Sequence, residues 1–179
     1  MSLKSRFPTI QQISAVYGVI TIIIYGWTIL QFFWRLPSWN NFFTAGDIFT
    51  VLAYSMATNL LESLTVLLVP LLLCIILPRK WFKEVFVSKG SWMVVLGLGY
   101  TMYLSRQLSA NIDNNYPAQL IQLTLVVGVL IFCLTFLFDR VSLLRKLMEE
   151  IADRASIFSY IFIPLSLISL LVVIARNIF

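Results

Sequence analysis

The polar residues that could do chemistry gather in one long apolar stretch, residues 47–77. They recur at close to every third or fourth position: Thr50, Ser55, Thr58, Asn59, Glu62 and Thr65. This spacing places them on roughly one face of a helix. In a membrane, such a face must turn toward protein or water, because unsatisfied polar groups are costly in hydrocarbon. Two interpretations follow: hydrogen-bonded glue between helices, or a polar path or ligand site.

Glu62 is the most unusual member of this set, because an ionised group in lipid costs on the order of 3 kcal/mol or more. It lies fifteen residues before Leu77, roughly 22 Å along a helix. Arg106 lies fifteen residues after Ser91, where a later apolar span begins, so the two charges are expected at equal depth. Arg106 is therefore the candidate counter-ion. The alternative is a protonated Glu62 in proton or cation coupling, since burial without a partner favours the neutral carboxyl group.

The elements that carry these residues are predicted to be membrane helices. Of the 179 residues, 60% are hydrophobic and 12% are charged, whereas a soluble domain carries about 25% charged residues. Mean hydropathy is +0.91, which excludes a water-soluble globular protein. We expect one all-α integral membrane domain over residues 1–179. Its predicted transmembrane spans are 13–34, 47–77, 91–108, 117–138 and 156–175.

The basic residues predict how these spans are threaded. With five crossings, ten of the thirteen Lys and Arg residues fall on one side, and only Arg35, Arg106 and Arg176 fall on the other. Cytoplasmic loops are enriched in Lys and Arg, so the asymmetry favours a polytopic bundle with the N-terminus inside and the C-terminus outside. Removing the third span would spoil it. The same charge distribution accounts for the net charge of +5, so we expect no nucleic-acid partner.

The segment 139–154 is predicted to form an amphipathic cytoplasmic helix. Leu143, Leu147 and Ile151 share one helical face, and they are candidates for docking a partner helix. Asp139 and the other acidic residues of the segment alternate with bases and are expected on the helix surface. A solvated connector, an extension of the fourth span and a helix lying on the membrane surface as an elbow are the alternatives.

Catalytic chemistry finds no support in the sequence. The chain has no His, and it lacks the nucleotide-binding, metalloprotease and hydrolase motifs. Its two cysteines, Cys74 and Cys133, lie within apolar runs and suit packing. We therefore expect no enzyme, no cofactor and no metal site.

These observations predict a multi-pass protein of the cell membrane, with a bacterial inner membrane as the best match to the charge asymmetry. The first functional hypothesis is a non-enzymatic subunit or an assembly or scaffold factor of a membrane complex, with the lipid bilayer and other membrane proteins as its partners. The second is a small transporter, channel or proton-coupled protein that uses Glu62 and its polar helix face.

Overall fold

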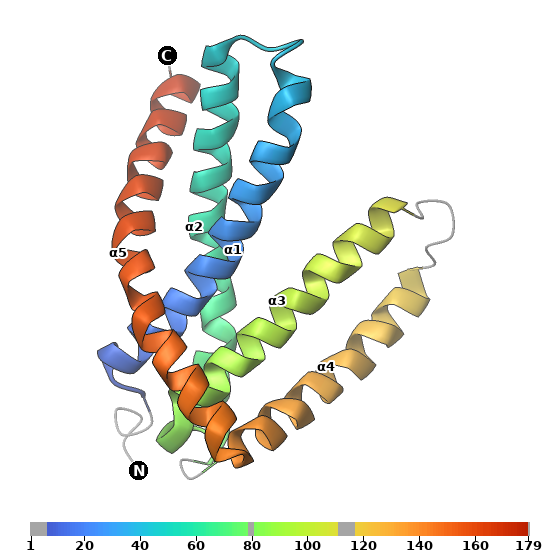
Figure 1. Ribbon diagram of the computed structural model, residues 1–179, viewed down its shortest axis with the longest axis vertical. Helices are drawn as coiled ribbons and strands as arrows, with labels where there is room; N and C mark the ends of the chain where they lie inside the picture. The colour runs from blue at the N-terminus through green and yellow to red at the C-terminus, as the bar shows by residue number, and fades with distance from the viewer. Residues whose placement is uncertain (1–6, 79–80, 111–116, 179) are drawn as a thin grey trace.

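The computed structural model describes residues 7–78, 81–110 and 117–178, and within them the fold is entirely helical. Five long helices and the short 3-10 helix η2 (Lys83–Val85) follow one another along the chain (Figure 1). The long ones are α1 (Ile10–Trp39), α2 (Ala45–Ile76), α3 (Phe86–Ala110), α4 (Pro117–Arg140) and α5 (Ser142–Ile178). The prediction of an all-α helical bundle is confirmed.

Capping boxes set the starts of α1 and α2. The Thr9 hydroxyl accepts from the backbone N–H of Gln12 at 3.3 Å, and the Gln12 side chain accepts from the Thr9 backbone N–H at 2.9 Å. Thr44 and Asp47 form the same reciprocal pair before α2. Each box satisfies donors that a helix N-terminus leaves free. Both helices therefore begin a few residues earlier than the apolar runs predicted.

Four helical segments are long and apolar enough to cross a membrane: α1, α2, residues 120–140 of α4, and α5. Among the described helices, α3 does not meet this criterion. It nevertheless runs antiparallel to α4 and ends beside that helix's start, so the two form a hairpin (Figure 1). Four of the five predicted crossings are thus supported by length and composition, and the crossing by α3 stays a prediction.

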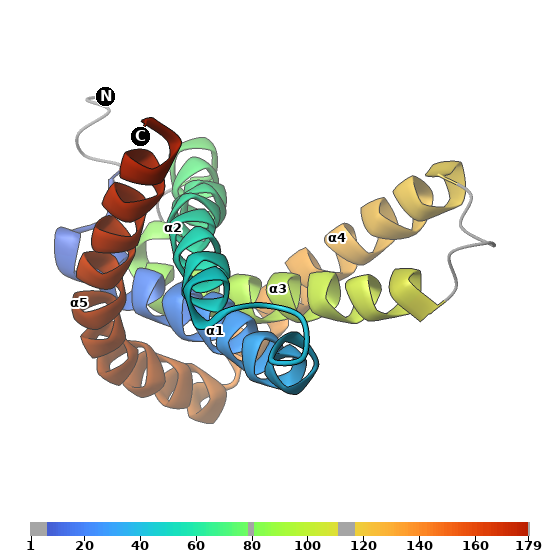
Figure 2. The same cartoon turned by 90° about the horizontal axis from the view of Figure 1, so that it is seen from above.

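The helices form two groups, as the view from above shows (Figure 2). Helices α1, α2 and α5 pack together, and we call them the three-helix unit. The α3–α4 hairpin joins it at one end and leans away toward the other (Figure 1). The joined end, where α2 and α4 finish, carries six described basic residues and is called the basic end: Lys83, Lys89, Arg140, Arg145, Lys146 and Arg154. The opposite, far end carries Arg35, Arg106 and Arg176.

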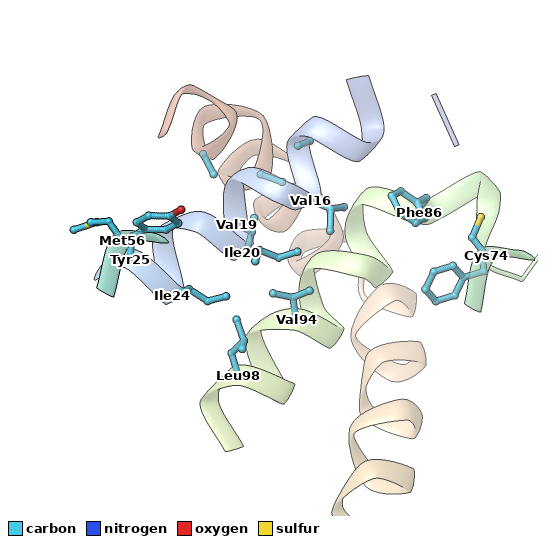
Figure 3. Packing of buried hydrophobic residues seen from close by; sticks show 14 residues of the cluster. Val16, Val19, Ile20, Ile24, Tyr25, Met56, Cys74, Phe86, Val94 and Leu98 are labelled. Atoms are coloured by element: carbon cyan, nitrogen blue, oxygen red, sulfur yellow. The ribbon is translucent and has the colours of Figure 1, made fainter. Parts of the chain in front are cut away.

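The buried core lies where α1 crosses α3 and α5 (Figure 3). Val16, Ile20 and Ile24 of α1 meet Val94 and Leu98 of α3 there. On the α5 side, α1 comes so close at Gly18 that an added Cβ would stand 2.5 Å from the backbone carbon of Ala155. Glycine is what permits this approach of two helix backbones.

The predicted amphipathic helix is not a separate element. A bend at Val141 ends α4, and α5 then continues without interruption from Ser142 to Ile178. No glycine or proline occurs between residues 142 and 163, so nothing in the sequence breaks the helix before the last span. The segment is therefore the start of α5 and no extension of α4.

The amphipathic face of this segment is uncovered within the chain. Leu143, Leu147 and Ile151 are 67%, 47% and 52% exposed. Met148 and Ala152, on another face of the same turns, are buried against the bundle. The candidate docking residues thus point away from the helices that support them.

Candidate functional site

The polar residues of α2 divide between a hollow and the outer surface. A hollow of about 440 Å³ lies between α1 and α2, and we call it the polar hollow. It is lined by Thr28, Thr50, Val51, Tyr54, Ser55, Thr58 and Asn59. Glu62 and Thr65 follow on α2 but line none of it, and both are exposed.

The hydroxyl groups of α2 mostly bond to their own helix. Ser55 donates to the Val51 carbonyl at 2.8 Å, and Thr58 donates to the Tyr54 carbonyl at 2.9 Å. Thr65 likewise donates to the carbonyl of Leu61 at 2.8 Å. Such bonds satisfy a hydroxyl without a partner from another helix. These three residues therefore do not act as interhelical glue within this chain.

Thr50 and Asn59 are the members of the set that bond to other helices. The Thr50 hydroxyl accepts from the Arg176 guanidinium of α5, and Asn59 joins α2 to α1. Its Oδ1 accepts a hydrogen bond from the Thr28 hydroxyl at 3.0 Å. The side chain is buried, and its Nδ2 has no hydrogen-bond partner among the described residues. Asn59 thus holds two helices together and still presents an unused donor beside the polar hollow.

Glu62 and Arg106 do not form the hypothesised ion pair. In the described part of the chain, Glu62 makes no hydrogen bond or salt bridge. Arg106 lies near the end of α3, where the hairpin has leaned away from α2 (Figure 1). Equal depth along two helices brings charges together only when those helices stay side by side, and α2 and α3 do not.

Arg106 instead shares a hollow with α1. This outer hollow, about 570 Å³, lies between the far half of α1 and the last turns of α3. Its lining is Trp27, Gln31, Trp34, Arg35, Ser105, Arg106 and Gln107. Two arginines from different helices, Arg35 and Arg106, therefore line the same hollow, and Glu62 does not line it.

The hydrogen bonds that do join the three-helix unit come largely from residues outside the predicted set. Tyr17 and Ser63 hydroxyls lie 3.0 Å apart, and Tyr25 and Ser166 hydroxyls lie 2.7 Å apart. All four side chains are buried, and Ser63 falls four residues after Asn59 on α2. That spacing was the available signal for Ser63. Nothing in the sequence indicated which tyrosine would reach it.

A second missed feature is a nearly buried ion pair at the basic end of the hairpin. Lys89 Nζ of α3 lies 3.4 Å from Asp139 Oδ2 of α4, and their side chains are only 7% and 11% exposed. The ammonium group also lies 4.4 Å from the ring centroid of Phe136 and donates to the Trp81 carbonyl. The expectation that Asp139 lies on the helix surface is therefore wrong. The antiparallel contact of α3 with α4 covers it.

The remaining acidic residues of the basic end gather around a third hollow, of about 450 Å³. Glu84, Glu149, Glu150 and Asp153 line it, together with the start of α1. Glu149 pairs with Arg145 at 3.0 Å, and Glu150 pairs with Arg154, each four residues along α5. No group of three or more His, Cys, Asp or Glu side chains in the described ranges could hold a metal ion.

No protein-family model, curated protein or solved structure matches this chain. The features that bear on function are therefore those of the chain itself: the exposed Glu62 face of α2, the polar hollow beside it, and the outer hollow with its two arginines.

Proposed function

We propose that this chain is a non-enzymatic subunit, or an assembly or scaffold factor, of a membrane protein complex. It contributes an exposed polar helix face to a neighbouring membrane protein. The main support for this proposal is the position of Glu62. Its carboxylate lies well inside an apolar helix and is exposed on the outer surface of its own bundle.

The energetics of Glu62 favour a partner from another chain. Thr58 and Thr65 flank it at helical spacing, and all three side chains are exposed. Both threonines satisfy their hydroxyls on their own helix, so only the carboxylate is left without a polar contact in the described residues. An uncompensated charge in hydrocarbon costs on the order of 3 kcal/mol or more. A cation or hydrogen-bond donor on a partner helix would offset that cost.

The apolar surface of the chain adds support. Seven large apolar side chains of α4 are exposed: Ile121, Leu123, Leu125, Val126, Val129, Leu130 and Leu137. At the basic end, the uncovered Leu143, Leu147 and Ile151 face lies on a part of α5 that also carries charges. Lipid suits the first surface. The second lies beyond the apolar part of α5 and suits a partner helix in the aqueous boundary.

The membrane and orientation are part of the same proposal. The basic end is placed in the cytoplasm, because Lys and Arg are enriched on that side of membrane proteins. All five helices then cross, including α3, and the chain is multi-pass with its C-terminus outside. A bacterial inner membrane fits this charge distribution.

Co-purification tests the proposal. The tagged chain is isolated in mild detergent from its native membranes, as wild type, Glu62→Leu and Thr65→Val. Thr65→Val is the matched control, because it keeps the side-chain shape one turn away and removes only a hydroxyl bonded within α2. We expect a stoichiometric partner with wild type and Thr65→Val, and about tenfold less of it with Glu62→Leu, the equivalent of 1.4 kcal/mol. Equal recovery from all three variants, or no partner with wild type, would refute the proposal.

The alternative is a small transporter, channel or proton-coupled protein. The polar hollow supports it, since Asn59 and Thr58 line the hollow three and four residues before Glu62. The packed core around Val16, Ile20 and Val94 separates this hollow from the basic end and speaks against an open path. Proteoliposomes with the purified chain decide it. Proton or cation flux that is lost in Glu62→Gln would establish the alternative.

A further inference from the structure

We propose that this chain binds an anionic lipid with a phosphate headgroup, held between α3 and the neighbouring helices α1, α2 and α4. The headgroup lies in the outer hollow, and one hydrocarbon chain lies in a second, apolar hollow nearer the basic end. This site is separate from the Glu62 face and does not depend on a partner protein.

The headgroup end is defined by Arg35 and Arg106. They come from α1 and α3, both are exposed, and in the described residues neither forms an ion pair or hydrogen bond. No acidic residue lines the hollow that they share. Two guanidinium groups that line one hollow without a carboxylate favour a bound anion, and the planar guanidinium matches phosphate oxygens in pairs.

The other side chains of the outer hollow suit a lipid headgroup. Gln31 and Gln107 supply amide donors beside the arginines. Trp27 and Trp34 form the α1 wall, and tryptophan is enriched at headgroup depth in membranes. The far-end position of the hollow agrees with that depth, because the last turns of α3 line it.

The hydrocarbon end is a hollow of about 410 Å³ between α2, α3 and α4. Val66 and Val69 of α2, Leu98 of α3, and Ile131 and Phe132 of α4 are among its lining residues. Thr101 contributes the single polar side chain in the lining, and its hydroxyl is satisfied by the Leu98 carbonyl at 2.9 Å. This volume is within the range of ligand pockets, about 300–1,000 Å³.

One stripe of α3 connects the two hollows. Leu98 and Thr101 line the apolar hollow, and Ser105 lines the outer hollow. Their spacing of three and then four residues keeps them on one face of the helix, and the distance from first to last is about 10 Å. The two hollows therefore share α3 as a wall, with the outer hollow at its far end and the apolar hollow nearer the basic end. This order of polar and then apolar lining matches the order of headgroup and hydrocarbon chain in a lipid.

Two glycines make the apolar hollow open to a precise test. Gly97 and Gly128 line it, and a Cβ added at either position would meet no atom within 4 Å. A side chain at either position would therefore start in open space within the hollow lining. Gly99, two residues further along α3, also has open space around it but lines neither hollow. Gly99→Leu is therefore the matched control for Gly97→Leu.

The test measures lipid binding to the purified chain by native mass spectrometry, with phosphatidylglycerol, phosphatidylcholine and chainless glycerol phosphate as probes. We expect phosphatidylglycerol to bind in preference to the other two. Arg35→Gln and Arg106→Gln should each weaken it about tenfold, the effect of losing a charge-assisted hydrogen bond. Arg140→Gln, which removes an exposed charge at the basic end, should leave affinity unchanged. Gly97→Leu should weaken binding at least tenfold and Gly99→Leu should not.

Each contrary outcome overturns the proposal in an identifiable way. Equal binding of phosphatidylcholine would make the site a general lipid contact. Glycerol phosphate binding as tightly as the lipid, with no effect of Gly97→Leu, would leave only a free-anion site. Arginine variants that bind within twofold of wild type would remove the headgroup assignment. Glu62→Leu should not change lipid affinity, so failure of this proposal and failure of the proposed function are distinguishable.

Discussion

The three-helix unit and the α3–α4 hairpin are held together in different ways. In the unit, contacts are spread along the helices: Tyr17 with Ser63, Tyr25 with Ser166, and the close approach at Gly18. In the hairpin, the strongest contacts gather at the basic end around Lys89, and toward the far end a hydroxyl contact of 3.3 Å joins Tyr100 to Thr124. Because the hairpin is held at the basic end, it can diverge from the three-helix unit toward the far end, where the outer hollow lies.

The largest loss of stability is expected from breaking the Lys89–Asp139 ion pair, which holds α3 and α4 together at the basic end. Lys89→Met leaves Asp139 nearly buried without its cation, which should cost about 3–5 kcal/mol of unfolding free energy. Reversible unfolding in mixed micelles measures it. The double variant Lys89→Met with Asp139→Leu should recover most of the loss, because no charge is then left unpaired. If Lys89→Met lowers the unfolding free energy by less than about 0.5 kcal/mol, as expected for an exposed pair, then the Lys89–Asp139 ion pair does not hold the hairpin together.

A smaller loss of unfolding free energy is expected from adding a methyl group at Gly18, where α1 and α5 are in close contact. Gly18→Ala puts a methyl group against the backbone of Ala155 and Ser156, and overpacking of this kind costs about 1–3 kcal/mol. Gly26→Ala is the control on the same helix, since its Cβ would meet nothing within 4 Å and alanine favours helix. The same unfolding measurement should rank Gly18→Ala clearly below Gly26→Ala. Equal stability would mean that α1 and α5 are not in contact there.

The smallest losses of stability are expected from removing one hydrogen bond in the three-helix unit and one in the α3–α4 hairpin, which compares the two directly. Tyr25→Phe removes a hydrogen bond of 2.7 Å and leaves the buried Ser166 hydroxyl without it, at a cost of about 1 kcal/mol. Tyr100→Phe removes the hairpin's exposed contact with Thr124, whose hydroxyl also bonds to Leu120, and should cost less than half as much. A larger loss from Tyr100→Phe would reverse the comparison between unit and hairpin.

The sequence predicted the fold class and the approximate spans because apolar runs and basic flanks act locally along the chain. It missed the starts of α1 and α2, which Thr9 and Thr44 fix through caps outside the apolar runs. It also separated the 139–154 segment from the last span, although no residue there breaks the helix. A change from amphipathic to apolar pattern marks where a helix leaves the membrane surface, and it does not mark where the helix ends.

The candidate site was predicted less completely, because the sequence gives the depth of a residue along its helix and does not give which helices lie beside each other at that depth. Glu62 and Arg106 were matched by depth, but α3 diverges from α2 toward the far end, and Arg106 lines a hollow with Arg35 instead. Lys89 and Asp139 lie far apart in sequence, so only the antiparallel contact of α3 with α4 could reveal their pairing. What could be located from sequence was the carboxylate itself, and the structure leaves it exposed on α2.

Cross-linking from position 62 shows directly whether the α2 face contacts a partner subunit. A photoreactive amino acid replaces Glu62, and in a matched variant it replaces Tyr160, which is 72% exposed on the apolar part of α5. The native membranes are irradiated before any detergent is added. If the α2 face contacts a partner subunit, position 62 will form one discrete protein adduct and position 160 will not. Lipid adducts alone at both positions would contradict the account, because Glu62 would then face the bilayer without a protein partner.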